Sequence, residues 1–285
     1  DGSGSSLLRP ARGAFVRHAM IGSGPPGGSW HSMSPSTVSL SPGSWMDLPG
    51  HSLQEHLQDS AASPEARKLV RKVGAEALAG SRVPRWLVAE YYSAYAQRLS
   101  STTFLNGTVE ALEPDGDEWK LRIVPASGSG ECEQSSWEVK AKAVVLAMGA
   151  ADLPRTLGIP GEDLSWVTHR PPIHSPALVE KIGHLLVVGA GLSAADAILH
   201  TLRQGAVRVT HVFRGAALST KIGKMFGSST GSAMYREEEW LAQLMAGVAT
   251  DPRYTAHAES ELLEITESGC RVSGPHGEET IAGVT

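Results

Sequence analysis

The sequence predicts an α/β fold in which strands and helices alternate to build a parallel sheet. The apolar run HLLVV is followed by a glycine-rich turn, GAGLSAAD, at Gly189–Asp196. A helix is expected from about Ser193 to Arg203, and a second apolar strand at Val207–Phe213. A strand, a helix and a strand within about 30 residues form the βαβ unit of a Rossmann-type domain.

The glycine-rich turn has the spacing of a dinucleotide fingerprint. Gly189 provides the tight bend, and Gly191 lets a phosphate approach the backbone where a Cβ would block it. Ser193 adds a hydroxyl near the helix start, and Ala194 occupies the third position, where the helix packs on the strand. A diphosphate is bound at such a turn by free N–H groups and the helix dipole. These four residues are therefore the predicted nucleotide site; the alternative is a glycine-rich turn without a ligand.

The residue after the second strand indicates which nicotinamide nucleotide is bound. NAD-specific units usually have an acidic residue there, which binds the ribose 2′-hydroxyl. This chain has Arg214 instead, whose guanidinium can pair with a 2′-phosphate. We therefore expect NADPH rather than NADH; the alternative is an ordinary solvated arginine.

The other expected elements come from periodicity and turn residues. Helices are expected at Ser63–Ala79, with Gly80 as its stop, at Arg85–Leu99 and at Ala233–Ala246. Strands are expected at Thr103–Leu112, Glu118–Val124 and Ser136–Lys142, at a fully buried run Ala143–Ala147 ending near Gly149, and in a hairpin at Leu262–Val284. A Pro/Gly-rich connector, Leu153–Pro176, is expected to cross between two domains.

Composition excludes several classes of protein. The 285 residues are enough for two domains, and a net charge of -5 without a basic stripe argues against nucleic acid as a partner. Cys132 and Cys270 form no CxxC pair, and the histidines have no metal-type spacing, so neither a redox dithiol nor a metal site is expected. No run is long enough to span a membrane. A cytoplasmic location is expected.

Two further motifs fail on context. Gly22, Gly24 and Gly27 also fit GxGxxG, but the serines and prolines that follow cannot form the required helix. Ser229 lies in GSSTG, a nucleophile-elbow pattern, but no apolar strand precedes it. Tyr91, Tyr92 and Tyr95 are interpreted as packing residues.

Four segments together resemble the oxidative stress-induced growth inhibitor family, within the wider group of class B flavin monooxygenases. They are PGGSWHSM at 26–33, VVLAMG at 144–149, LGIPGE at 157–162 and GAGLSAADAIL at 189–199. The resemblance implies a two-dinucleotide-binding Rossmann-type fold, with a partial FAD-binding domain at 1–165 and an NADP(H)-binding domain at 166–285. It places Gly27, Gly28 and Trp30 along the flavin, and Gly149 near the FAD.

The resemblance also implies a reaction. Hydride would pass from NADPH to FAD, and the reduced flavin would use oxygen to oxygenate an unidentified substrate, with a protein among the candidates. The alternatives are a non-catalytic regulatory protein that keeps the nucleotide fold, and a flavin or disulfide reductase. The name of the family further implies a role in growth regulation and in the response to oxidative stress.

The chain also departs from the family pattern. Met148 stands where relatives commonly have threonine. No FAD fingerprint precedes Ile21, and relatives continue past Thr285. The chain is therefore expected to be an internal fragment, inactive on its own, and no catalytic residue is nominated.

Overall fold

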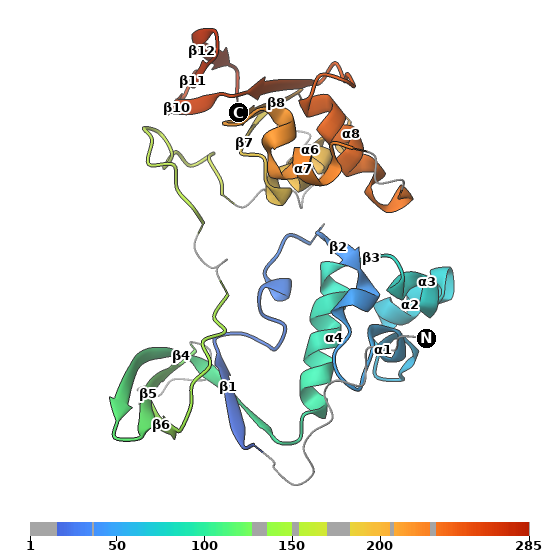
Figure 1. The fold of residues 1–285 in the computed structure, drawn as a ribbon, viewed down its shortest axis with the longest axis vertical. Helices are drawn as coiled ribbons and strands as arrows, with labels where there is room; N and C mark the ends of the chain where they lie inside the picture. The colour runs from blue at the N-terminus through green and yellow to red at the C-terminus, as the bar shows by residue number, and fades with distance from the viewer. Residues whose placement is uncertain are drawn as a thin grey trace. The chain divides into compact units, whose positions relative to one another are not determined.

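The computed structural model describes residues 16–35, 37–126, 136–149, 154–169, 183–205, 208–228 and 232–284. The chain divides into two compact units, residues 1–152 and 153–285. Figure 1 labels their elements. No helix in the described ranges is both long and apolar enough to cross a membrane.

A parallel sheet in the order β7-β8-β9 forms the centre of the second unit. β7 spans His184–Val188, β8 Arg208–Phe213 and β9 Tyr254–Ala258. α6 (Leu192–Gln204) connects β7 to β8 and packs on both strands through a face that buries Ala195, Ile198 and Leu202. The expected α/β fold with a βαβ unit is confirmed.

Two further helices follow β8, and both contact α6 (Figure 1). They are α7 (Lys221–Phe226) and α8 (Arg236–Met245), each preceded by a short 3-10 turn, η4 (Ala217–Ser219) and η5 (Ala233–Tyr235). The guanidinium of Arg253 caps the C-terminal end of α6. It donates to the carbonyl oxygens of Leu202 and Gly205 at 2.7 and 2.9 Å.

An antiparallel sheet lies against the parallel one through a shared apolar core. β10 (Glu261–Thr266), β11 (Gly269–Gly274) and β12 (Gly277–Ala282) are adjacent in that order. Val212 of β8 is buried with Leu262 and Val272, and Ile159 and Leu164 pack on the same cluster. Residues 153–165, expected in the first domain, therefore lie in the second unit, and the division falls earlier than 165/166.

Helices and a short two-stranded sheet form one part of the first unit. The helices are α1 (Leu53–Gln58), α2 (Pro64–Val73), α3 (Ala75–Ala79) and α4 (Arg85–Arg98). β2 (Val38–Pro42) pairs antiparallel with β3 (Arg82–Pro84). Their core contains Leu53, Leu87 and Tyr91, each with no exposed surface.

The single helix expected at 63–79 is wrong, because Gly74 divides it. Gly74 has φ +90°, a backbone conformation that favours glycine, and its N–H donates to the carbonyl of Val70 at 2.7 Å. The start is as expected, with Ser63 capping the N–H of Ala66 and Pro64 at the first helical position.

A four-stranded sheet, ordered β1-β4-β5-β6, completes the first unit. β4 (Thr102–Asp115), β5 (Glu118–Pro125) and β6 (Trp137–Ala141) are antiparallel, and residues 116–117 form the turn between β4 and β5. β1 (His18–Gly22), which the sequence analysis did not predict, pairs parallel with β4.

The fully buried strand expected at 143–147 is also wrong. Residues 143–149 form no strand, and Val145, Leu146 and Met148 are 87%, 68% and 76% exposed. An apolar run becomes a buried strand only where other layers cover both of its faces. Within the described ranges, no such layers bury these side chains.

Candidate dinucleotide-binding site

The turn from β7 into α6 brings the predicted fingerprint residues together. Gly189 has φ +100°, and Gly191 is the residue that caps the start of α6. Ser193 and Ala194 lie in the first turn of the helix. The first N–H groups of a helix have no acceptor within it, so this end of α6 offers donors to an anion.

The geometry of the turn fits a diphosphate. A Cβ added to Gly189 or Gly191 would meet nothing within 4 Å, so open space lies beside both residues. Ser193 is exposed, and Ala195 is the first buried residue of α6. The backbone at these two glycines can therefore be approached closely.

Both polar backbone groups of Gly189 are held from β8. Its N–H donates to the carbonyl of Val212 at 2.9 Å. Its carbonyl oxygen lies 2.7 Å from Nε2 of His211, and Nδ1 of the same ring lies 2.8 Å from the hydroxyl of Tyr254 on β9. A hydrogen-bond chain thus links β8 and β9 to the turn that follows β7.

Burial determines the protonation states of His211 and Tyr254. The His211 side chain has no exposed surface. Desolvation disfavours the imidazolium form and lowers the pKa of His211 to about 4, although the hydrogen bond to Gly189 acts in the opposite direction. Burial likewise raises the pKa of the Tyr254 hydroxyl. Both groups are therefore neutral at physiological pH.

Arg214 lies at the same edge of the sheet as the turn. Val188 pairs with Val212 in parallel register, so the chain leaves β7 and β8 at neighbouring positions. The Arg214 side chain is 79% exposed, and its guanidinium lies 3.7 Å from a carboxylate oxygen of Glu261. The guanidinium is accessible to a phosphate, with one carboxylate as its present neighbour.

Glu261 is the first residue of β10, and the turn that precedes it is fixed to the end of β8. The N–H of Ser260 donates to the carbonyl of Phe213 at 3.0 Å, and the N–H of Glu259 donates to that of Gly215 at 3.3 Å. The sequence analysis missed His211, Tyr254 and Glu261. A histidine inside the apolar strand VTHVF was the available signal, since a buried polar side chain needs a partner.

Gly28 and Trp30 lie in the first unit on a short 3-10 segment, η2 (Gly28–His31), and Gly27 is the residue that precedes it. Gly27 and Gly28 have φ +115° and +52°, and a Cβ on Gly28 would meet nothing within 4 Å. Trp30 is half-buried against the helical core. A Cβ on Gly27 would meet the His31 ring at 2.9 Å, so of the two glycines it is Gly28 that leaves the backbone open for contact with a flat ligand.

The η2 segment is fixed to α4 by side-chain hydrogen bonds. Ser93 donates to the carbonyl of Pro26 at 2.9 Å, and His31 Nε2 lies 2.9 Å from the same oxygen. Arg85 donates to the carbonyls of Trp30 and His31 at 3.1 and 3.0 Å. Because η2 follows β1 in place of an α-helix, the Gly22–Gly27 motif opens no phosphate-binding helix, as expected.

Gly149 lies at the end of the exposed run 143–149 and has φ +70°. Its proximity to a flavin stays a prediction. Ser229, Cys132 and His174 lie outside the described residues. The residues that the structure does describe contain no cluster of histidine, cysteine or acidic side chains able to hold a metal ion.

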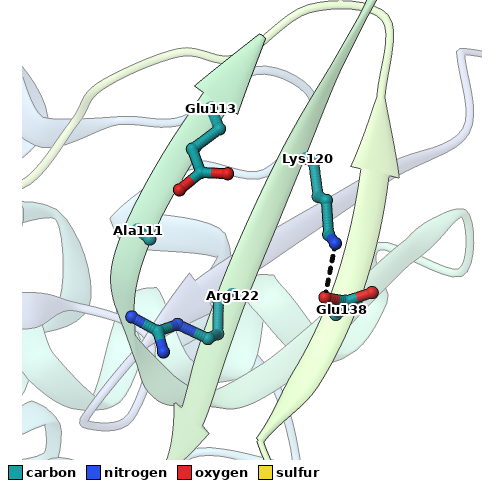
Figure 2. Close-up of a pocket in the computed structure, with 5 residues that line it drawn as sticks. All are labelled: Ala111, Glu113, Lys120, Arg122 and Glu138. Atoms are coloured by element: carbon teal, nitrogen blue, oxygen red, sulfur yellow. Dashed lines mark ion pairs between the residues drawn. The ribbon is translucent and has the colours of Figure 1, made fainter. Parts of the chain in front are cut away.

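A shallow hollow on the β4–β6 sheet offers a second group of polar side chains. Figure 2 shows its lining, which is Ala111, Glu113, Lys120, Arg122 and Glu138. Lys120 pairs with Glu138 at 2.6 Å, and Arg122 lies 3.8 Å from Glu110. These paired and exposed charges form a mixed sheet surface, so the hollow is a weaker candidate than the turn after β7.

Comparison with known proteins supports the nucleotide fold. The family described as pyridine nucleotide-disulphide oxidoreductase matches residues 75–282. Oxidative stress-induced growth inhibitor 2 of Homo sapiens is 30% identical over 233 residues, covering 70% of this chain and 43% of the relative. Oxidative stress-induced growth inhibitor 1 of Mus musculus is 33% identical over 216 residues, covering 70% and 42%. The predicted resemblance is confirmed, and the chain spans less than half the length of these relatives.

Solved flavoprotein structures share the fold. The bacillithiol disulfide reductase Bdr of Bacillus cereus has a TM-score of 0.62 at 19% identity, covering 93% of this chain and 67% of that one. A flavin-containing monooxygenase of Stenotrophomonas maltophilia has a TM-score of 0.56 at 17% identity, covering 94% and 75%. At these identities the likeness establishes the FAD/NAD(P)-binding Rossmann-type fold alone.

Proposed function

The chain belongs to the pyridine nucleotide-disulphide oxidoreductase family, and on this premise we propose that it contributes to an FAD- and NADPH-dependent monooxygenase-like oxidoreductase. The observation that carries the proposal is the turn at Gly189–Ala194, which follows a parallel strand and leaves backbone space open beside both glycines. In this proposal the second unit binds NADPH, and residues 1–152 contain part of the FAD-binding domain.

Each group of residues has a defined role in the proposal. The first N–H groups of α6 bind the NADPH pyrophosphate, and Arg214 binds the 2′-phosphate. Gly27, Gly28 and Trp30 lie along the flavin, where Gly28 lets the backbone approach it and Trp30 offers a flat ring face beside it. Bound FAD would supply the redox chemistry, while the protein orients the two nucleotides and excludes water.

The biological setting comes from the names of the relatives. Two of them are called oxidative stress-induced growth inhibitors, so we place this chain in growth control under oxidative stress. The second candidate is a regulatory protein that binds nucleotide without turnover. It is favoured by one observation: the names of these relatives describe growth inhibition and not a reaction.

Flavin content and NADPH consumption separate the two candidates. The full-length protein that carries this sequence, purified from its natural source, is expected to show flavin absorbance at about 450 nm. It should oxidise NADPH faster in air than under nitrogen. A protein that binds NADP⁺ but never oxidises NADPH would support the regulatory candidate. A protein that binds neither nucleotide would contradict both.

Arg214 determines the nucleotide preference in this proposal. Arg214→Ala should weaken NADP⁺ binding by roughly tenfold and leave NAD⁺ binding almost unchanged, because only NADP⁺ has the 2′-phosphate. Calorimetric titration with both nucleotides measures the ratio. Arg208→Ala is the matched control, since Arg208 is an exposed arginine at the opposite end of β8. An unchanged affinity ratio in Arg214→Ala would show that the assignment is wrong.

A further inference from the structure

A histidine is buried directly beneath the nucleotide turn, at a position where strand residues are usually apolar. His211 lies at the middle of β8, between Thr210 and Val212, and its ring bridges Gly189 and Tyr254. Neither polar partner is close in sequence, since they are 22 and 43 residues away. The ring therefore joins the turn to a strand that is formed much later in the chain.

The partners of the ring fix where its proton is. A carbonyl oxygen can only accept, so Nε2 of His211 must bear the hydrogen that is donated to Gly189. In a neutral imidazole Nδ1 is then an acceptor, and the Tyr254 hydroxyl must donate to it. Each hydrogen bond thus selects the tautomer that the other one requires.

The bond to Gly189 also fixes the next peptide group. A trans peptide is planar, and its C=O and N–H point in opposite directions. The described backbone contains no cis peptide bond. While the Gly189 carbonyl faces His211, the N–H of Ala190 is therefore turned away from the ring. If this peptide rotated, a carbonyl oxygen would take the place of that N–H.

We propose that His211 and Tyr254 are positioning residues for the dinucleotide: they hold the Gly189–Ala190 peptide in the orientation that presents an N–H, and not a carbonyl oxygen, to the diphosphate. The inference rests on the proposed nucleotide site and adds two residues to it. Gly189 needs this restraint because a glycine at φ +100° can leave that conformation at little steric cost.

The charge state of the ring is consistent with this role. Burial lowers the pKa of His211 to about 4, so the ring stays neutral across the physiological range and keeps Nδ1 free to accept. An imidazolium would have hydrogens on both nitrogens and would lose the Tyr254 hydroxyl as a donor partner.

Two amide substitutions test the two ring nitrogens of His211 separately. The side-chain nitrogen of Gln reaches about as far as Nε2, so His211→Gln can still donate to Gly189. His211→Asn places its amide near Nδ1 and does not reach the turn. Both bury a neutral amide, so they have similar desolvation costs. We expect His211→Asn to weaken NADP⁺ binding roughly five- to tenfold and His211→Gln to keep most of the affinity.

Tyr254→Phe tests the tautomer directly. Without the hydroxyl, only the bond to Gly189 selects the Nε2–H tautomer, and ¹⁵N NMR of the ring should show a smaller population of that tautomer than in wild type. NADP⁺ binding should weaken in parallel. Because Tyr254 acts through His211, the double variant Tyr254→Phe/His211→Asn should bind NADP⁺ no more weakly than His211→Asn alone.

The outcomes distinguish this inference from the nucleotide site itself. Gly191→Ala places a methyl group where the phosphate must approach, so it should abolish binding whatever His211 does. If the wild-type chain does not bind NADP⁺, or if Gly191→Ala binds it normally, the proposed function fails. If Gly191→Ala fails to bind while folded His211→Asn binds like wild type, only the positioning role is overturned. Equal losses in Gln and Asn would also overturn it.

Discussion

At the residue scale, location decides how much a polar contact contributes. The Lys120–Glu138 pair on the first unit is exposed, and solvent screens such pairs until they contribute little. The contacts of His211 are shielded from water, so losing one partner leaves a buried polar group unsatisfied. The stability of the second unit should therefore depend more on the neutral, buried His211 than on exposed ion pairs at its surface.

Burial of His211 predicts a particular pH dependence of stability. Its pKa is about 4 in the folded chain and about 6.5 when unfolded, so between these values the unfolded state binds more protons. The free energy of unfolding should fall as the pH decreases from about 6.5 to 4, by up to about 3 kcal/mol from this group. Urea unfolding followed at several pH values measures it.

Replacing His211 separates its contribution to the pH dependence of stability from that of the carboxylates, which titrate in the same pH range. His211→Gln has no ionisable group at this position, so its unfolding free energy should change less with pH than that of wild type. Tyr254→Phe keeps the buried imidazole and should retain most of the pH dependence. A His211→Gln chain with the wild-type pH dependence would show that the ring is hydrated in the folded state.

At the element scale, the sequence analysis predicted those helices and strands that are determined by interactions within one short segment. The β7–α6–β8 unit was predictable because apolar runs, a glycine turn and helical periodicity occur within one short segment. The same holds for Gly189 and Gly191. The break at Gly74 was missed because a glycine inside a helical pattern is often tolerated, at a cost of about 1 kcal/mol.

Other features depend on contacts between distant segments. β9 was not predicted, because its sequence YTAHA becomes a strand by pairing with β8. Residues 143–147 have the composition of a buried strand, yet burial requires covering layers that the run itself cannot specify. Likewise, His211 became recognisable as part of the site only once its two remote partners were known.

At the scale of the whole molecule, each compact unit has a core of its own. The first is centred on residues such as Leu53 and Leu87, and the second includes Val212 and Leu262. The segment after residue 153 belongs to the second core because Ile159 and Leu164 pack there. A Cβ on Gly161 would clash with the backbone carbonyl of Ile265, so this segment lies tightly against β10.

Separate cores predict separate responses to a cavity. Leu87 on α4 and Ile198 on α6 are both fully buried. Leu87→Ala should destabilise the first unit, and Ile198→Ala the second, each by about 2–5 kcal/mol, because neighbouring side chains fill the cavity only partly. Hydrogen exchange read by mass spectrometry should show faster exchange in α1–α4 for the first variant and in β7–β9 for the second. If either substitution accelerates exchange equally in both sets of elements, the two units unfold as one, and the division at residue 152 has no energetic meaning.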